Sequence, residues 1–319
     1  MSIRVIITKT FPHMSEVATE TVKEHIVRVL GNKEEFVLGL ATGSSPIGLY
    51  KRLAKAANAG EFDSARIRSF NLDEYVGLPG ENAQQRMMHP ESYCYFMIQE
   101  FFGLLKNKFI ESSVPFGALI DQQELIRHLK TYPGDWREVG TDAGRSIVIK
   151  QRPESEYLAW IRRGVLDAYT RKIKKAGGID LQIIGVGGRG HVAFHESGIP
   201  FKGSRVMLVK LDDNTVENAV ADGHFASKKD SPRYAITMGS ELVYQADTVV
   251  LLASGRRKVS SVAESLLSDP SPDVPISYGQ IYAEKGGNLI YVVDRIVGKP
   301  LLTDRKALKQ KGIDVRNLA

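Results

Sequence analysis

The stretch LQIIGVGGRGHVAFHESG, residues 181–198, decides the fold class and holds the first candidate groups for chemistry. Residues 181–186 are apolar apart from Gln182 and do not alternate with polar ones, which predicts a strand covered on both faces, as in parallel sheets. The glycines that follow allow positive φ angles and a close approach of a ligand to the backbone. His191 and Glu196 come where such a strand leaves the sheet, which is the usual place for a binding site.

Strands alternate with helices on either side of this stretch. Apolar or β-branched runs predict strands at residues 4–8, 36–41, 67–72, 205–211, 234–238 and 248–253. Helical spacing of apolar residues predicts helices at 14–30, 47–57, 92–105 and 154–175. This order predicts an α/β fold with a mostly parallel central sheet, helices on both faces, and a ligand crevice beyond the carboxyl ends of the strands.

Two segments lack these patterns. Residues 111–155 collect proline and glycine without periodicity, which predicts an irregular inserted segment within a single domain spanning residues 1–319. The polar segment 212–230 is expected to form a mobile lid. A chain with 43% hydrophobic residues can bury the large core that such a domain needs.

The composition argues against several classes of protein. The single cysteine, Cys94, cannot form an internal disulfide, which indicates a reducing, cytoplasmic compartment. We expect no membrane contact, because neither a signal peptide nor an apolar run long enough to cross a bilayer is visible. The net charge of +6 is spread among acidic residues without a nucleic-acid-binding motif, so we expect a small anionic substrate and no nucleic acid.

A phosphate site is the first candidate, at the sequence TGSSP, residues 42–46, between a predicted strand and a predicted helix. Backbone N–H groups, hydroxyls and the positive end of the helix dipole converge there, which suits a phosphate. The alternative is ordinary N-capping of the helix by Ser44 or Ser45. A nucleotide P-loop is excluded, because Leu49 stands where its lysine must be.

Neither a cofactor nor a metal is expected. The glycines at 185–190 spell the dinucleotide-binding GxGxxG pattern, but that pattern also needs a helix whose amino end receives the pyrophosphate. Glycine and proline interrupt residues 198–203, the span available for that helix, which argues against nicotinamide or flavin. His191 and His195 need a helix to face one metal ion, and the surrounding glycines disfavour it.

Two pairs of side chains are candidates for proton transfer. Asp73 and Glu74 follow a predicted strand, and a carboxylate held there can move a proton on a substrate carbon. The alternative is a solvated acidic pair in a turn. Glu196 is close enough in sequence to orient or protonate His191, and the alternative is a histidine that makes only a structural hydrogen bond.

Taken together, the motifs resemble the glucosamine-6-phosphate deaminase (isomerase) family, which shares a superfamily with 6-phosphogluconolactonases and ribose-5-phosphate isomerases. The matching stretches, in family order, are LGLATGSSPIGLYKRL (38–53), SFNLDEYVGL (69–78), HPESYCYFM (89–97), GGIDLQIIGVGGRGHVAFHES (177–197), SPRYAITMG (231–239) and ASGRRK (253–258). They span most of the chain. The resemblance implies a Rossmann-like, three-layer α/β/α fold.

The same resemblance implies a metal-free isomerisation of an amino-sugar phosphate from aldose to ketose, coupled to the loss of ammonia. Asp73 would move the proton between C2 and C1, and His191, oriented by Glu196, would open the sugar ring. The residues that would hold the sugar phosphate are Thr42, Gly43, Ser44, Ser45 and Lys258. A family of this kind uses no cofactor.

Several departures from the family pattern fall near the implied site. Arg189 stands where the family has an aspartate before the Gly-His pair. We expect it either to favour a neutral imidazole and a lowered Glu196 pKa, or to bind an anionic group of the substrate. Val220 or Ala221 stands where the family's lid carries a phosphate-binding arginine, and His195 replaces an asparagine.

Three hypotheses stay open for the function. The chain is an amino-sugar phosphate isomerase and deaminase, a phosphosugar-binding protein with little or no catalysis, or a hydrolase resembling 6-phosphogluconolactonase. Members of the family often form oligomers, so we expect a homo-oligomer. Allosteric activation by an amino-sugar phosphate is not expected, because Met207 and Val209 stand where some members have basic residues.

Overall fold

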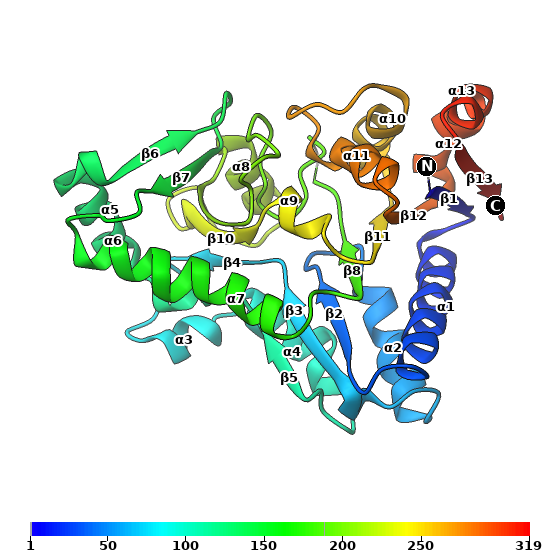
Figure 1. The fold of residues 1–319 in the computed structure, drawn as a ribbon, viewed down its shortest axis with the longest axis horizontal. Coiled ribbons are helices and arrows are strands. Elements are labelled where there is room, and N and C mark those ends of the chain that lie inside the picture. The colour runs from blue at the N-terminus through cyan, green and yellow to red at the C-terminus, as the bar shows by residue number, and fades with distance from the viewer. Residues whose placement is uncertain (1, 188) are drawn as a thin grey trace.

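The computed structural model describes residues 2–187 and 189–319 (Figure 1). Its centre is an eight-stranded sheet in the order β13-β1-β12-β11-β8-β2-β3-β5, whose paired strands run parallel. These strands are β1 (Ser2–Thr8), β2 (Phe36–Leu40), β3 (Ile67–Asn71), β5 (Glu111–Ser113), β8 (Leu181–Ile184), β11 (Thr248–Ala253), β12 (Asn288–Asp294) and β13 (Ile313–Asn317). The prediction of an α/β fold around a mostly parallel sheet is confirmed.

Some helices cover the two faces of this sheet, toward which alternate strand residues point, and others lie around the second sheet (Figure 1). They are α1 (Phe11–Leu30), α2 (Ile47–Asn58), α3 (Ala83–Met87), α4 (Tyr93–Glu100), α5 (Gln122–Thr131), α6 (Glu156–Trp160), α7 (Asp167–Lys175), α8 (Asp213–Ala221), α9 (Ser240–Val243), α10 (Val259–Leu267), α11 (Gly279–Glu284), α12 (Arg295–Thr303) and α13 (Arg305–Gln310). Leu38 of β2 packs with α1, α2 and α4, whereas Val37 belongs to the cluster that includes α7, α10 and α12. None of the helices in the described residues is long and apolar enough to cross a membrane.

A second sheet is antiparallel, and its strand β4 follows the end of β3 in the chain. Its strands, in order, are β4 (Asp73–Val76), β10 (Tyr234–Met238), β9 (Val206–Lys210), β7 (Arg145–Ile149) and β6 (Trp136–Val139). The predicted strands at 205–211 and 234–238 therefore lie outside the central sheet. Leu72 joins the two sheets, since its N–H donates to the Leu40 carbonyl and its own carbonyl accepts from the Met238 N–H. Asp73 therefore lies at the start of the second sheet, directly after Leu72 leaves the central sheet.

The segment 111–155 is not irregular, contrary to the prediction. It contains β5, α5, β6 and β7, and buried Asp135 fastens it by accepting hydrogen bonds from the N–H groups of Glu154 and Ser155. Strands β6 and β7 are four and five residues long, and β7 pairs with the distant β9, so local periodicity did not reveal them. The segment 212–230 contains α8, and its mobility stays a prediction, as does the single domain.

The predicted long helices are present with interruptions. Residues 154–175 form α6, a π-helical turn over Ile161–Leu166, and α7. The helix expected at 92–105 is α4, which ends at Glu100 and is followed by a 3₁₀ turn over Phe102–Leu104.

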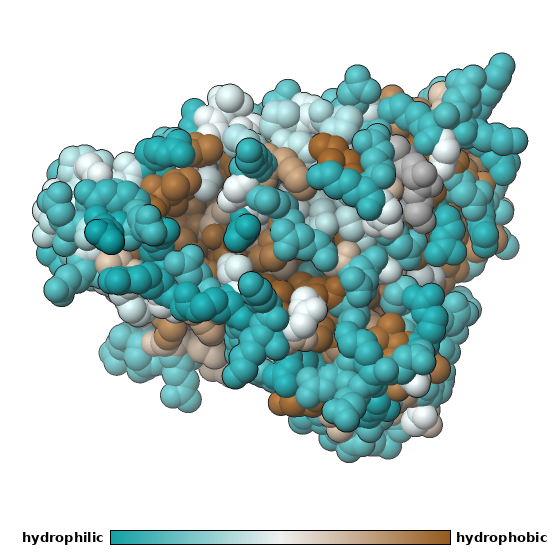
Figure 2. Space-filling model, viewed as in Figure 1, coloured by the Kyte–Doolittle hydropathy of each residue, from teal (hydrophilic) through white to brown (hydrophobic). Residues whose placement is uncertain are grey.

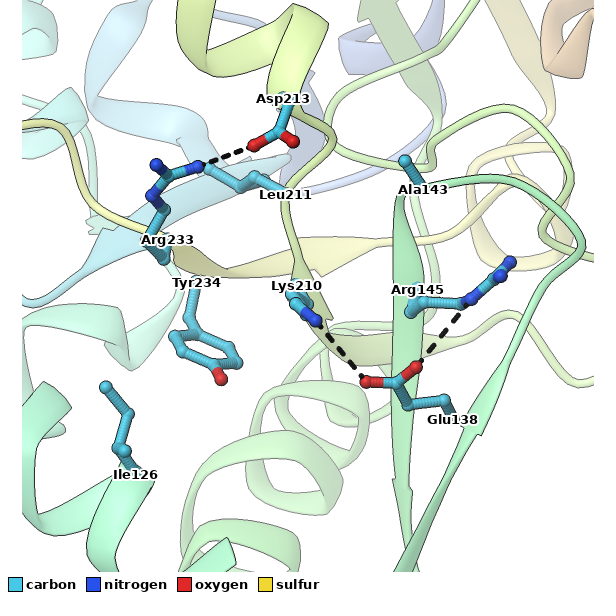
Figure 3. A pocket seen from close by; sticks show the side chains of 9 residues that line it. All are labelled: Ile126, Glu138, Ala143, Arg145, Lys210, Leu211, Asp213, Arg233 and Tyr234. Atoms are coloured by element: carbon cyan, nitrogen blue, oxygen red, sulfur yellow. Dashed lines mark hydrogen bonds and ion pairs between the residues drawn. The ribbon is translucent and has the colours of Figure 1, made fainter. Parts of the chain in front are cut away.

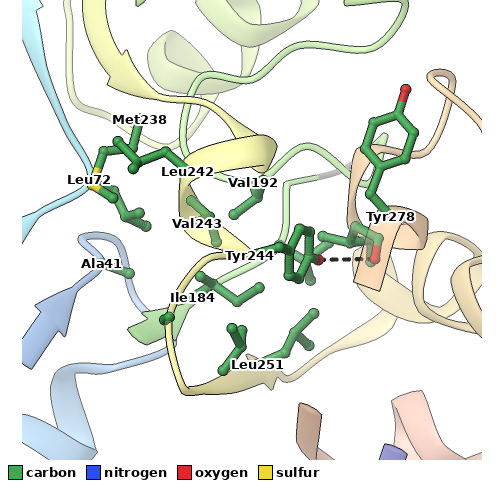
Figure 4. Close-up of a cluster of buried hydrophobic side chains, with 14 of the residues drawn as sticks. Ala41, Leu72, Ile184, Val192, Met238, Leu242, Val243, Tyr244, Leu251 and Tyr278 are labelled. Carbon is green, nitrogen blue, oxygen red and sulfur yellow. Dashed lines mark hydrogen bonds between the residues drawn. The ribbon is translucent and has the colours of Figure 1, made fainter. Parts of the chain in front are cut away.

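A cluster of buried apolar side chains supports the loop after β8 (Figure 4). Ile184 at the end of β8 and Val192 in the loop belong to it, together with Leu72 between the sheets and Met238 at the end of β10. Because close-packed side chains resist displacement, this cluster fixes the backbone on both sides of the glycine turn.

Candidate active site

Four loops lie at the carboxyl edge of the central sheet. The strands β11, β8, β2 and β3 are neighbours in this order and run parallel, so the loops that follow them are side by side (Figure 1). The segments that follow these strands carry Lys258, the pair His191 and Glu196, residues 42–45, and Asp73 at the start of β4, respectively. Candidates from distant parts of the sequence therefore share one edge of the sheet.

Asp73 is a buried carboxyl without a structural task. Its side chain belongs to a residue with 4% of its surface exposed, and Oδ1 has no hydrogen-bond partner among the residues that the structure describes. Burial, together with the negative charge of Glu74, raises the pKa of Asp73 well above its usual value. A raised pKa makes an ionised carboxylate a stronger base, as a group that removes a carbon-bound proton must be.

Glu74, the next residue, is also buried and its pKa is also raised by burial, but its side chain is held by hydrogen bonds. Its carboxylate accepts hydrogen bonds from the N–H groups of Tyr75, Tyr93 and Cys94 and from the Ser92 hydroxyl, at 2.8–3.1 Å. Three of these donors belong to the amino end of α4, where a negative charge is also favoured by the helix dipole. Glu74 therefore anchors α4, and the alternative of a solvated acidic pair is wrong.

His191 and Glu196 make a short polar contact in the loop after β8. His191 Nδ1 lies 3.3 Å from Glu196 Oε2, and Glu196 has 3% of its surface exposed. Burial acts to raise the pKa of Glu196, but hydrogen bonds from His191, Thr215 and the N–H of Asp212 outweigh it and lower the pKa. An ionised Glu196 holds the proton on Nδ1, which leaves Nε2 of a neutral imidazole able to accept one.

The glycine turn makes room for this imidazole. A Cβ atom on Gly187 would lie 1.8 Å from His191 Nε2, and the Gly187 N–H donates to the His191 carbonyl. Gly190 takes a φ of +79°, which closes the turn ahead of His191. No helix follows within the described part of residues 185–204, so the GxGxxG pattern lacks the element that dinucleotides need.

Arg189 is held by two carboxylates. Its guanidinium pairs with Asp142, and its Nη1 lies 3.4 Å from Asp212 Oδ2, while 45% of the side-chain surface is exposed. The lowered pKa of Glu196 that the sequence suggested is present, but its causes are His191, Thr215 and the Asp212 N–H. Binding of a substrate anion by Arg189 stays a prediction, and such an anion would compete with both carboxylates.

The tip of the β6–β7 hairpin packs against the loop after β8 that carries His191 and Glu196. The Thr141 N–H donates to the Gly198 carbonyl, and a Cβ atom on Gly144 would lie 2.5 Å from the Glu196 Cβ. Neither Asp142 nor Asp212 was predicted at this site from the residue patterns. A signal existed for Asp212, whose side chain caps α8 as the pattern Asp-Asp-Asn-Thr suggests.

His195 is a structural residue. Its Nδ1 accepts from the Ser240 N–H at 3.0 Å, and its Nε2 donates to the Ile199 carbonyl at 2.9 Å. Burial lowers the pKa of His195 to about 4, so the ring is neutral at pH 7. Across residues 2–187 and 189–319, no three His, Cys, Asp or Glu side chains gather as a metal site requires.

The turn between β2 and α2 leaves the amino end of α2 open. Gly43 takes a φ of +90°, and Gly43 and Ser44 are exposed. The N-cap residue of α2 is Pro46, and within the described residues no side chain caps the first turn, so capping by Ser44 or Ser45 is wrong. The N–H groups at the amino end of α2 point out of the helix, which suits a phosphate.

Lys258 ends a short turn, Arg256–Lys258, at the amino end of α10. Burial and the nearby charge of Arg257 lower the pKa of Lys258, so a bound anion would stabilise its charged form. Arg257 pairs with Asp222 at the end of α8, with 2.9 Å between Nη2 and Oδ1. Arg257 is therefore a cation at the end of α8, where Val220 and Ala221 lie, although it comes from the turn after β11 and not from α8 itself.

Comparisons with known proteins agree with this geometry, although no family model matches the chain. The glucosamine-6-phosphate deaminase of Thermoanaerobacter sp. (strain X514) is 34% identical over 272 residues, 85% of this chain and 86% of that protein. The glucosamine-6-phosphate deaminase of Clostridium botulinum (strain Loch Maree / Type A3) is 30% identical over 292 residues, 92% of this chain and 96% of that protein.

Two solved structures share the fold. A monomeric glucosamine-6-phosphate deaminase superposes with a TM-score of 0.69 at 24% identity and covers 94% of this chain and 100% of its own. The 6-phosphogluconolactonase of Trypanosoma brucei gives a TM-score of 0.58 at 17% identity, with 94% and 100% covered. These likenesses confirm the Rossmann-like arrangement.

Proposed function

Because the chain belongs to the glucosamine-6-phosphate deaminase family, we propose that it isomerises and deaminates an amino-sugar phosphate, with glucosamine 6-phosphate as the first candidate substrate. The observation that carries the proposal is buried Asp73, whose free carboxyl oxygen lies on the same edge of the sheet as the His191–Glu196 pair. A proton carrier and an acid–base imidazole are the two groups that such a reaction needs.

His191 opens the sugar ring in this proposal. Its Nε2 takes the proton of the anomeric hydroxyl and returns it to the ring oxygen as the bond from C1 to that oxygen breaks. Glu196 keeps Nδ1 protonated throughout, because its pKa is lowered and its carboxylate is anchored by the Asp212 N–H. The imidazole can therefore act as base and then as acid without changing its orientation.

Asp73 then moves the carbon-bound proton. It takes the proton from C2 of the opened aldose while the substrate's ammonium group gives a proton to O1, which forms an enolamine. Asp73 then delivers its proton to C1, which leaves a protonated imine at C2. Water adds to the resulting imine at C2, and ammonia leaves, so the product is the ketose phosphate. Glu74 stays fixed by α4 and takes no part in proton transfer.

The phosphate is held by Thr42, Gly43, Ser44 and Ser45 at the amino end of α2, with Lys258 supplying the positive charge. Arg189 borders the opposite side of the loop and keeps Asp142 and Asp212 in place.

Release of ammonia from glucosamine 6-phosphate by the purified protein tests the proposal. We expect turnover by the wild type and none above background with Asp73→Asn, whose folding is checked by thermal unfolding. Binding of the substrate by calorimetry without any turnover would favour a phosphosugar-binding protein instead. Hydrolysis of 6-phosphogluconolactone without deamination would favour the lactonase hypothesis, for which the shared fold is the supporting observation.

We further infer that the protein works in the cytoplasm without a cofactor, a metal, nucleic acid or a membrane, and that it forms a homo-oligomer. The single cysteine and the mixed surface charge support the first inference. Sedimentation equilibrium tests the second, and a mass of 35.3 kDa, that of one chain, would contradict it.

A further inference from the structure

The helical segment that runs through α6, the π-helical turn and α7 has one face that the rest of the described chain leaves uncovered (Figure 1). Its inner face is buried in the main core cluster through Leu158, Val165, Tyr169 and Ile173. The opposite face, which we call the outer helix face, carries exposed or half-buried residues at helical spacing, among them Glu156, Trp160, Arg163, Asp167, Lys174 and Lys175. Figure 2 shows hydrophilic side chains where Figure 1 places these helices.

The cavity on the second sheet is a useful contrast, because its charged side chains already have partners (Figure 3). Glu138 lies 3.7 Å from Arg145 Nε and 3.7 Å from Lys210 Nζ. Arg233 pairs with Asp213, with 2.8 Å between Nη1 and Oδ1. These charges therefore offset one another within a single chain.

The charges of the outer helix face have no such partners. Within residues 2–187 and 189–319, the side chains of Glu156, Arg163, Asp167 and Lys174 make no ion pair and no hydrogen bond. Glu156 and Arg163 line the same cavity, of about 530 Å³, without contacting each other. Charges of both signs are thus free on one face of one helical segment.

The middle of the outer helix face is apolar. Trp160 is 38% exposed, and its indole lies against the backbone of Gly164, where a Cβ atom would lie 3.0 Å from Cδ1 and Nε1. The cavity adjoins this indole and is also lined by Pro153 and Ala159. Tryptophan and arginine are the side chains that most often contribute binding energy at protein interfaces. An exposed tryptophan between free charges therefore suits contact with another protein.

The order of the charges along the outer helix face shows which protein would fit. Glu156 and Lys174 lie equally far from Val165 along the chain, on opposite sides of it, and so do Arg163 and Asp167. A second copy of the helix, placed antiparallel about a two-fold axis at the level of Val165, brings Glu156 opposite Lys174. The same axis brings Arg163 opposite Asp167. Each attraction then occurs twice, as in any interface in which two copies use the same surface.

We propose that the outer helix face binds a second copy of this chain, with the two helical segments antiparallel. Trp160 of each copy packs against the other helix, and the free charges pair across the contact. That copy is the partner in the homo-oligomer inferred under the proposed function, an inference on which this contact rests. One pair of helices covers less area than a permanent interface, so the dimer dissociates on dilution.

Reversing the charges at either end of the outer helix face tests the contact. Glu156→Lys places a base at the acidic end, and the double change Lys174→Glu with Lys175→Glu places acids at the basic end. Sedimentation equilibrium should show that each variant associates with itself about tenfold more weakly than the wild type, or weaker still. An equimolar mixture of the two variants should form a heterodimer about as tight as the wild-type dimer, because opposite charges meet again.

Lys306→Glu in α13, an exposed charge reversal at the other end of the molecule, is the matched control and should dimerise like the wild type (Figure 1). Thermal unfolding checks the fold of each variant. Self-association that neither reversal weakens, or folded variants that do not recover it when mixed, would overturn the contact. A wild type that stays monomeric would overturn the inferred homo-oligomer as well, whereas the proposed deamination is measured separately and stands or falls by ammonia release.

Fluorescence gives a second readout that reports on this face alone. The chain has two tryptophans, so Trp136→Phe leaves Trp160 as the only one. On dilution its emission should shift to longer wavelength as the indole loses the second copy, and the shift should be absent once Glu156→Lys is added. Emission that stays constant while sedimentation shows the dimer dissociating would place the contact elsewhere and overturn the proposal.

Discussion

Asp73 and Glu74 are adjacent buried carboxyls, and neutralising each one separately is expected to have a different consequence. Glu74→Gln should lower the stability of the fold, whereas Asp73→Asn should abolish turnover. Glu74 accepts two hydrogen bonds on each carboxylate oxygen. Whichever way the new amide turns, its NH₂ group faces two of those donors. Hydrogen bonds to a charged group contribute about 1.5–3 kcal/mol each, so losing two of them in Glu74→Gln should lower the free energy of unfolding by about 3–6 kcal/mol. That is a large share of the stability of a domain.

Asp73→Asn should leave the fold intact. Oδ1 of Asp73 makes no hydrogen bond within the described residues, and burial already disfavours its ionised form. A neutral amide of the same shape is therefore expected to change the free energy of unfolding by about 1 kcal/mol or less. It cannot carry a proton, however, so turnover should fall by about a hundredfold or more.

Urea denaturation and ammonia release, measured on the same preparations, decide between these outcomes. Glu74→Gln should show an early unfolding transition and keep turnover at low temperature in proportion to its folded fraction. Asp73→Asn should unfold with the wild type and be inactive. The reverse pattern, a stable Glu74→Gln without activity beside an active Asp73→Asn, would refute the assignment of the two carboxyls.

Three further predictions concern the loop after β8 that carries His191 and Glu196. Gly187→Ala places a Cβ atom 1.8 Å from His191 Nε2 and must displace the ring, so turnover should fall about a hundredfold while thermal unfolding changes little. The folded-state pKa of Glu196 is lowered, so its charge stabilises the fold above the unfolded value of about 4.3 and that stabilisation is lost as pH falls through the folded value. In acid denaturation, the wild type should lose this stabilisation as pH falls, whereas Glu196→Gln should not. Parallel curves of stability against pH for the two proteins would contradict this prediction. Arg189→Ala frees the hairpin tip at Asp142 and should lower kcat/KM about tenfold, with partial rescue by Arg189→Lys, whereas unchanged kinetics would show that the ion pair is dispensable.

Much of the central sheet could be predicted from the sequence, because fully buried parallel strands are uninterrupted apolar runs. The run at 181–186 and the β2 residues 36–40 illustrate this. The antiparallel sheet could not be assembled in the same way. Its edge strand β6 has no fully buried residue. The strands β7 and β9 pair although they are far apart in the sequence, and local patterns cannot reveal such a pairing.

The candidate site was predictable where motifs lie at strand ends, and less so where contacts are long-range. Asp73, His191 and Glu196 follow β3 and β8, and their place in the fold is set by those strands. The residue pattern alone did not separate Asp73 from Glu74, and only the family resemblance singled out Asp73, because the physical distinction depends on the amino end of α4. It also could not bring in Asp142, which reaches the loop through the fold of the second sheet.

The proton transfer assigned to Asp73 is the central claim, and glucosamine 6-phosphate carrying deuterium at C2 tests it most directly. Product analysis by NMR follows where the deuterium goes while ammonia is counted. The wild type should turn over the labelled substrate more slowly than the unlabelled one and leave part of the deuterium at C1 of the ketose phosphate. Equal rates with no deuterium at C1, or no ketose phosphate from the wild type, would contradict the claim.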